Sequence, residues 1–341
     1  MPNPEIMLIQ NLLKKGEIEM KATRDGYGLG LIEAGEKDER VVVLCADLTE
    51  STRSDGFAKK FPERFIQIGV AEQNMAVVAS GLANYGKIPF ISSYAAFSPG
   101  RNNEQIRTNI SINNVPVKIG GAHAGISVGP DGATHQALED IALMRVQPRM
   151  VVLVPCDAEE ARKATVAAAF NGSPTYIRFG REKSPVFTTK DTPFEIGRAI
   201  VLRDSPSDSS GRLLPQVAII GCGMLLYNAL VAADELSKEG IECMVINSHT
   251  VKPLDEATIV AAAKKCSAVV SVEEHQVAGG LGSAVAECLA RNHPVPQEFI
   301  GVQDRFGESG KPDELIEAFG MGVNSIKEAV KKVLARKSQL T

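Results

Sequence analysis

Short, continuously apolar runs alternate with helical stretches along most of the chain, and no other feature restricts the fold as strongly. In the first half, strands are expected at residues 41–45, 65–68, 88–92, 115–120, 150–155 and 175–179. Helices are expected between them, at residues 74–84, 103–109 and 157–170. Strands that are apolar throughout and are joined through helices are typical of a parallel sheet covered on both faces. We therefore expect an α/β fold with a mostly parallel sheet.

A second block of the same kind follows a polar segment. Residues 204–212 are rich in Ser and Pro, which indicates a loop. Strands are expected after it at residues 217–220, 243–247, 268–272 and 298–302, with helices at 227–238, 256–265, 282–291 and 325–336. A length of 341 residues is sufficient for two domains. We expect a lead-in at residues 1–20 that is helical over 5–15, a first domain at 21–190, a linker at 191–212 and a second domain at 213–341.

Charge and composition exclude several classes of protein. The net charge of −4 argues against nucleic acid as a partner, because phosphate binding needs a basic surface. No apolar run is long enough to cross a bilayer, and the N-terminus lacks the pattern of a signal peptide. The six cysteines are scattered and form no CxxC pair. They are typical of reduced thiols in a cytoplasmic protein, without membrane association, disulfide frame or zinc site.

Glu72 is the first candidate for chemistry. It stands at the start of a helix whose following residues, 76–83, are small and largely apolar, so we expect this helix to be buried on nearly all sides. A lone buried carboxylate is costly, so Glu72 needs either a partner or a raised pKa that suits it to catalysis. The alternative is an ordinary first-turn acid that is favoured by the helix dipole.

Further candidates follow the ends of expected strands. The loop at residues 120–136 has five glycines and two of the chain's five histidines, which is more than a plain connection needs. A metal site in this loop is disfavoured, because two histidines twelve residues apart with one Asp match no common ligand spacing. Ligands of open α/β sheets gather at the carboxyl ends of the strands. The side chains expected at one such rim are Asp47, Ser51, Glu72, Tyr94, His123 and Asp131.

Five segments carry a specific resemblance to a known family. They are Ala46-Asp-Leu-Thr-Glu-Ser51, Gly69-Val-Ala-Glu-Gln73, Ser93-Tyr-Ala-Ala-Phe97, the run from His123 to Gln136, and Ile177-Arg-Phe-Gly-Arg181. In this order they resemble the C-terminal half of transketolase, as found in organisms that divide the enzyme between two polypeptides. The likeness runs from about residue 21 to 335. The first domain then resembles the pyrimidine-binding domain for thiamine diphosphate, and the second resembles the transketolase C-terminal domain, which has no direct catalytic role in the family.

The resemblance implies a role for each candidate around the cofactor. Glu72 matches the acid that hydrogen-bonds the aminopyrimidine ring and promotes its imino tautomer. Tyr94 and Phe97 match side chains that pack on this ring, and Asp47 matches a structural acid near the cofactor. The activity that the resemblance implies is transfer of a two-carbon ketol unit from a ketose phosphate to an aldose phosphate.

The resemblance also implies contacts to the sugar phosphates. Asp131 matches the acceptor of a hydrogen bond from the hydroxyl next to the donor carbonyl. His135 matches a histidine near the reacting centre, and His123 one in the substrate channel. The phosphate-binding set corresponds to Arg24, Ser51 and Arg181, with Arg178 as a competitor for the place of Arg181. Arginine suits phosphate because its donors form a fork.

The chain also departs from the family pattern. A ring-packing position three residues past Phe97 is Gly100, and the neighbours of Glu72 are Ala71 and Gln73 where full-length transketolases usually have Arg and His. The Gly-Asp-Gly…Asn motif that holds the diphosphate through a divalent metal is missing. We therefore expect a partner, the transketolase N-terminal subunit that carries this motif with Mg²⁺ or Ca²⁺, in a heterotetramer of two copies of each chain.

Other functions stay open at this point. Ala71 and Gln73 resemble related enzymes, so a 2-oxoacid dehydrogenase E1 β-subunit or a deoxyxylulose-phosphate synthase fragment are alternatives. Residues 46–51 and His123 favour sugar-phosphate transfer over both. A non-catalytic regulatory or scaffold subunit that has kept the fold is a third alternative, and the presence of Glu72, Asp131 and His135 argues against it.

Overall fold

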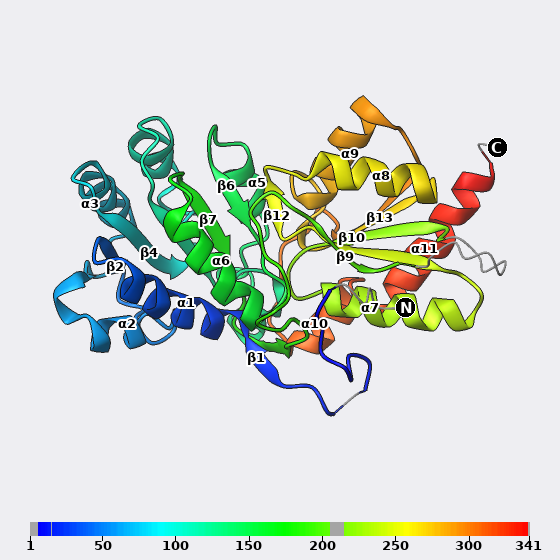
Figure 1. Ribbon diagram of the computed structural model, residues 1–341, viewed down its shortest axis with the longest axis horizontal. Helices are drawn as coiled ribbons and strands as arrows, with labels where there is room; N and C mark the ends of the chain where they lie inside the picture. Colours follow the sequence, from blue (N-terminus) through cyan, green and yellow to red (C-terminus); the bar gives the residue numbers. More distant parts are fainter. Residues whose placement is uncertain (1–5, 15, 205–214, 340–341) are drawn as a thin grey trace.

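The computed structural model describes residues 6–14, 16–204 and 215–339. Two helix-flanked sheets lie side by side along the long axis of the molecule (Figure 1). The first sheet has seven strands in the order β12-β6-β7-β5-β4-β2-β3, and the second has five in the order β14-β13-β10-β11-β9. Parallel pairs dominate both sheets, and the antiparallel strands β12 and β9 lie at their edges. The α/β architecture of two mostly parallel sheets is thus the one that the sequence predicts.

The central strands of the first sheet are buried on both faces. Its strands are β2 (Val41–Cys45), β3 (Phe65–Gln67), β4 (Ile88–Tyr94), β5 (Lys118–Ala122), β6 (Val151–Leu153), β7 (Thr175–Arg178) and β12 (Thr250–Lys252). Alternate residues of β2 face opposite layers: Val41 and Val43 belong to one core, and Val42 and Leu44 belong to the other. A strand that is apolar at every position is therefore explained by helices on both sides.

The helices of this half form two layers. One layer holds α1 (Thr23–Lys37), α2 (Asp55–Lys60) and α6 (Ala158–Phe170), whose apolar side chains share a core with Val41 and Phe90. The other holds α3 (Glu72–Asn84), α5 (Asp140–Arg145) and the π-helix η2 (Ile106–Ser111), which continues the short α4 (Asn103–Gln105). Helices α1 and α6 approach closely, because a Cβ at Gly26 would lie 1.8 Å from the carbonyl oxygen of Ala158. Shorter turns are η1 (Pro62–Arg64) and η3 (Ile126–Asp131).

The second half repeats the arrangement. Its strands are β9 (Ile200–Arg203), β10 (Val217–Gly221), β11 (Cys243–Asn247), β13 (Val269–Gln276) and β14 (Gln297–Val302). Helices α7 (Leu226–Lys238) and α11 (Val323–Ser338) cover one face, and α8 (Glu256–Cys266) and α9 (Leu281–Asn292) cover the other. The short helix α10 (Pro312–Ala318) packs against η3 of the first half. The α8–α9 layer shares one continuous core with α3 and α5, so the two halves are joined through apolar contact.

Two local expectations differ from the structure. The helix expected at residues 5–15 is absent from 6–14, where Leu8 forms a bridge with Thr188 and the amide of Ile9 donates to the carbonyl of Phe187. These long-range contacts and the burial of Leu12 outweigh local helix propensity. The expected linker at 191–212 contains β9, which pairs with β11; the rest of this linker, from residue 205 on, lies outside the described residues. Strand β12 crosses back to pair with β6, and β1 (Met20–Ala22) pairs with β8 (Lys183–Pro185).

Helix α3 also differs from expectation. Its residues Met75, Ala76, Ala79 and Ala83 are buried, whereas Gln73, Val77 and Gly81 are exposed. In this chain the helix is therefore buried along one face only, despite its small apolar residues.

All six cysteines are buried and none is in a disulfide. Within the described ranges, no helix has both the length and the apolar character needed to cross a membrane.

Candidate active site

The candidate residues meet at the carboxyl ends of four neighbouring strands, β5, β4, β2 and β3. His123 follows β5, Tyr94 ends β4, and Glu72 begins the helix that follows β3. Asp47 and Ser51 lie on the loop after β2, which pairs with both β3 and β4. Because the strands are parallel, loops far apart in the sequence reach the same edge of the sheet.

Glu72 is buried and has polar partners on both carboxylate oxygens. The hydroxyl of Ser93 donates to Oε1 at 3.0 Å, and the guanidinium of Arg101 donates to Oε2 at 3.0 Å. The side-chain amide of Asn102 donates to the main-chain oxygen of Glu72 at 3.0 Å, which fixes the start of α3. The helix N-terminus favours a negative charge at this place. Glu72 is therefore a held carboxylate inside the protein, and Ser93 and Arg101 are contacts that the sequence reasoning missed.

Four rings form an aromatic wall beside this carboxylate. Tyr94 and Phe97 stack with ring centroids 6.0 Å apart, and Tyr94 also stacks on His123 at 4.0 Å. His135 meets Phe97 edge-on at 5.4 Å. Gly100 adds no side chain to this wall, and a Cβ there would lie 2.1 Å from the carbonyl oxygen of Ala96. The wall offers flat apolar faces to a planar ligand.

His123 is buried in a cationic setting. Its Nε2 lies 3.5 Å from Nη1 of Arg24, and the same guanidinium nitrogen donates to the main-chain oxygen of Ser51 at 3.1 Å. Burial, together with the charges of Arg24 and Arg181, lowers the pKa of His123 to about 3. The imidazole is therefore neutral at physiological pH and can donate or accept a hydrogen bond without carrying charge.

Asp131 and Arg181 form a second pair near this cluster. Nη1 of Arg181 lies 3.2 Å from each carboxylate oxygen of Asp131, and both side chains are about one-third exposed. Nη1 of Arg181 also donates to the main-chain oxygen of Val128 at 3.4 Å, on the loop between His123 and His135. Both groups are accessible and can exchange their mutual contact for a ligand.

Arg178 has a different place. Its Nε donates to Asp140 at 2.8 Å, and its Nη2 donates to the main-chain oxygen of Glu274 at 2.7 Å. The side chain is buried and binds the first half of the molecule to the second. Arg178 is thus committed to the interior, which favours Arg181 over Arg178 as an anion-binding residue.

Asp47 and Ser51 lie at the edge of the group. Asp47 has an exposed side chain and a φ of 60°. Its main-chain amide donates to Oε1 of Gln67 at 2.9 Å. Ser51 joins the site through its main-chain oxygen and Arg24. Both lie at this rim because they follow β2 in the sequence; Asp47 is exposed and Ser51 is partly buried.

The chain's own residues do not supply a metal centre in the described parts. No three His, Cys, Asp or Glu side chains of residues 6–14, 16–204 and 215–339 lie together in a way that could hold a metal ion. His123 and His135 instead belong to the aromatic wall.

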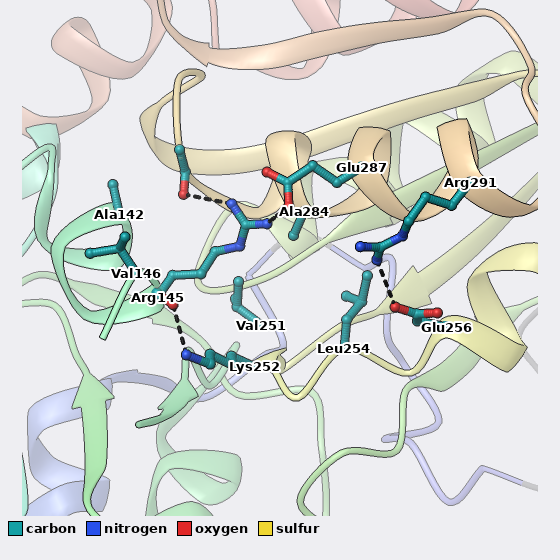
Figure 2. A pocket seen from close by; sticks show the side chains of 11 residues that line it. Ala142, Arg145, Val146, Val251, Lys252, Leu254, Glu256, Ala284, Glu287 and Arg291 are labelled. Carbon is teal, nitrogen blue, oxygen red and sulfur yellow. Dashed lines mark hydrogen bonds and ion pairs between the residues drawn. The ribbon is translucent and has the colours of Figure 1, made fainter. Parts of the chain in front are cut away.

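A cavity of about 590 Å³ lies elsewhere, between α5, β12 and α9 (Figure 2). Its wall carries Arg145, Lys252 and Arg291, but these cations contact protein groups. Arg145 pairs with Glu287, Arg291 with Glu256 at 3.0 Å, and Lys252 donates to the carbonyl of Arg145 at 2.9 Å. The cavity therefore has its charges compensated within its own wall and contains none of the candidate residues.

Comparison with protein families gives two matches that cover most of the chain. Residues 19–186 match the transketolase pyrimidine-binding domain, and residues 212–326 match the transketolase C-terminal domain. The site residues described above all fall within the first of these matches.

Individual relatives agree with these matches. The chain is 39% identical to a 6-deoxy-6-sulfo-D-fructose transketolase subunit of a Clostridium species, over 94% of this chain and 97% of that protein. It is 42% identical to a protein of Methanocaldococcus jannaschii named as a transketolase C-terminal section, over 91% of this chain and 95% of that protein. A solved split-gene transketolase, an inactive β4 tetramer, is 45% identical with a TM-score of 0.85, and the match covers 93% of this chain and 99% of that one.

Proposed function

The chain belongs to the transketolase family as a subunit of the split type, and we propose that it supplies the pyrimidine half of a thiamine diphosphate site that a second chain completes. The observation that carries this proposal is the buried carboxylate of Glu72 beside the wall of Tyr94 and Phe97. In this proposal residues 21–190 are the pyrimidine-binding domain and residues 213–341 the transketolase C-terminal domain. The chain would act in the cytoplasm, which suits its six free thiols.

The residues of this site fit an aminopyrimidine ring. A planar nitrogen heterocycle needs a flat apolar surface and an acceptor or donor at its edge, and Tyr94, Phe97 and Glu72 offer these. When bound, the cofactor supplies the nucleophilic carbon and electron sink for cleaving and forming carbon–carbon bonds. Glu72 would hold and exchange the proton at the ring nitrogen that it faces. Ser93 keeps the carboxylate oriented for this exchange.

The remaining side chains suit a sugar phosphate. Neutral His123 can hydrogen-bond a carbonyl or hydroxyl group. Nδ1 of His135 lies 2.9 Å from the Thr134 hydroxyl, and this imidazole would accept or donate a proton near the same wall. Asp131 would accept a hydrogen bond from a donor hydroxyl. Arg24 and Arg181 would bind the terminal phosphate, together with Ser51, because guanidinium groups match its tetrahedral oxygens.

A second chain is needed for the other half of the site. The sequence has no Gly-Asp-Gly…Asn motif, and the described residues contain no cluster suited to Mg²⁺ or Ca²⁺. We propose that a transketolase N-terminal subunit holds the metal and diphosphate, in a heterotetramer of two copies of each chain. The relative solved as an inactive β4 tetramer supports this view, since there the chain of this type is inactive in the assembly of four.

Reconstitution tests the proposal. The chain is purified alone and with a candidate partner that carries the motif, and both samples receive thiamine diphosphate, Mg²⁺, xylulose 5-phosphate and ribose 5-phosphate. Ketol transfer is expected only from the two-chain sample. Turnover by the chain alone would overturn the need for a partner.

The donor specificity separates the alternatives. A ketose phosphate is the expected donor, and 6-deoxy-6-sulfo-D-fructose is included because one relative is named for it. Pyruvate as the only accepted donor would indicate a 2-oxoacid dehydrogenase subunit or a deoxyxylulose-phosphate synthase fragment. Assembly with the partner but no reaction and no cofactor binding would indicate a scaffold subunit.

A further inference from the structure

Arg101 stands between Glu72 and the aromatic wall. Its Nη1 donates to Oε2 of Glu72 at 3.0 Å, and the carbon of the same guanidinium lies 4.6 Å from the centroid of the Phe97 ring. The Arg101 side chain is 48% exposed, whereas the Glu72 side chain is 1% exposed. One half-exposed cation thus contacts both parts of the proposed pyrimidine site.

The local backbone brings Arg101 to this place. The residues from Ala95 to Asn102 form a tight turn, in which the amide of Arg101 donates to the carbonyl of Phe97 at 3.0 Å. Gly100 adds no side chain to the wall and has no room for one. The side chain of Asn102, next in sequence, is buried and holds the main-chain oxygen of Glu72. The turn therefore aims two consecutive side chains at Glu72, one structural and one at the surface.

The guanidinium offers what the proposed ring site selects for. It is planar, it lies over Phe97 at a distance typical of cation–π contact, and it presents an N–H group to the carboxylate. We propose that Arg101 occupies the pyrimidine position of the cofactor-free chain as an internal substitute, and that cofactor binding displaces it from Glu72. This inference rests on the proposed function, because it names a competitor for the same carboxylate.

In the chain without cofactor, Arg101 compensates the buried charge of Glu72. A buried carboxylate without a partner is strongly unfavourable, and Ser93 alone is a neutral donor. Arg101 supplies the compensating charge until the cofactor arrives. Because almost half of its side chain is exposed, it can turn into solvent with little loss of packing. The consequence is that part of the cofactor's binding free energy is spent on displacing Arg101.

Two measurements on Arg101→Met test the proposal. In the complex with the partner chain, calorimetric titration with thiamine diphosphate and Mg²⁺ is expected to show a Kd that is about fivefold lower than in the unmodified complex or lower still, because the cofactor no longer has to displace Arg101 from Glu72. In the chain alone, without cofactor, the melting temperature is expected to fall by a few degrees, because Glu72 loses its charged partner.

Arg107→Met is the matched control. Arg107 lies on the same segment, in η2, and its side chain is exposed. This variant makes the same replacement of a positively charged side chain by a neutral one, at a surface position. It is expected to leave both the Kd and the melting temperature unchanged. Arg101→Lys keeps the charge but not the planar group, so its Kd should lie between those of Arg101→Met and the unmodified complex.

The outcomes are distinct. Unchanged or weaker cofactor binding by a folded Arg101→Met complex overturns the inference, since a competitor's removal must strengthen binding. If Arg101→Met does not fold, Arg101→Lys decides, and an unchanged Kd there overturns the inference as well. No cofactor binding by the unmodified complex contradicts the proposed function instead.

Discussion

Glu274, in the second half of the molecule, accepts a hydrogen bond at 2.7 Å from the main-chain amide of Ser127, in the glycine-rich loop of the first half. The two are buried, and the loop passes so close that a Cβ at Gly125 would lie 2.3 Å from Oε1 of Glu274. Gly125 itself has a φ of +94°, which few other residues adopt. The C-terminal half thus fixes the loop that carries His123 and His135.

Replacing Glu274 with Ala should lower activity without removing the catalytic groups. The Ser127 amide would lose its acceptor, which costs about 1–3 kcal/mol of folding stability. The loop would then shift, and a displacement of about 1 Å reduces turnover by up to about a hundredfold. Steady-state kinetics and chemical denaturation of the reconstituted enzyme measure these effects.

Glu308→Ala is a suitable control for Glu274→Ala. The Glu308 side chain pairs with Arg305 at the surface, and only its main-chain oxygen contacts the loop, through Gln136. This variant should retain activity. Equal activity of the two variants would show that the second half does not position the loop.

Glu72→Gln should abolish ketol transfer while the chain still assembles with its partner. The amide keeps the size of the side chain but cannot exchange a proton with the ring nitrogen, so a loss of about a hundredfold to ten-thousandfold is expected. Initial rates give the activity, and light scattering gives the mass of the complex. Glu63→Gln, at an exposed position before β3, controls for the loss of one negative charge. Turnover near normal in Glu72→Gln would contradict the role proposed for this carboxylate.

Arg181→Met and Arg178→Met should fail in different ways. Arg181 is partly exposed and can exchange its contact with Asp131 for a phosphate, so its loss should raise KM for sugar phosphates by about tenfold or more, with stability little changed. Loss of Arg178 removes the buried cation that faces Asp140 and the Glu274 carbonyl, leaving Asp140 only the Tyr176 hydroxyl, and should cost about 3–5 kcal/mol of folding stability.

Kinetics and denaturation of both variants decide between the two arginines. A raised KM in a fully stable Arg178→Met protein would reverse their assignment. A normal KM in Arg181→Met would remove Arg181 from the phosphate-binding set.

The sequence predicts the central strands well because their signal is local. A strand covered on both faces, such as β2 or β10, must be apolar at each position, and the pattern reveals it directly. The short edge strands β9 and β12 carry no such signal, because pairing with β11 and β6 decides their conformation. The same reason explains the lead-in, where contacts with residues 187 and 188 replace the expected helix.

The site is predictable to the level of strand ends and no further. Parallel strands deliver Glu72, Tyr94 and His123 to one edge, which follows from topology alone. The ion pair between Glu72 and Arg101 depends on the turn after Phe97 and on the side-chain direction it imposes. No periodicity marks that direction, so Arg101 is visible only in three dimensions. The same holds for Arg178 and Arg181, three residues apart, of which one is buried and one is at the surface.

His249 should make the folded chain sensitive to acid. It is fully buried, its ring stacks on Phe194 at 4.3 Å, and burial lowers its pKa from 6.5 to about 4. As the pH falls below 6.5, His249 binds a proton in the unfolded chain, whereas in the folded chain it stays neutral until about pH 4. The folded state therefore loses stability as the pH falls across that interval. The loss amounts to about 3 kcal/mol by pH 4.

In denaturation experiments at several pH values, the stability advantage of the unmodified chain over His249→Gln should shrink from pH 6.5 downward. Thr250→Val, which keeps the imidazole and removes only the hydroxyl 3.0 Å from Nδ1, should retain the full pH dependence. A constant difference between the unmodified chain and His249→Gln from pH 7 to pH 4 would show that another group causes the acid sensitivity.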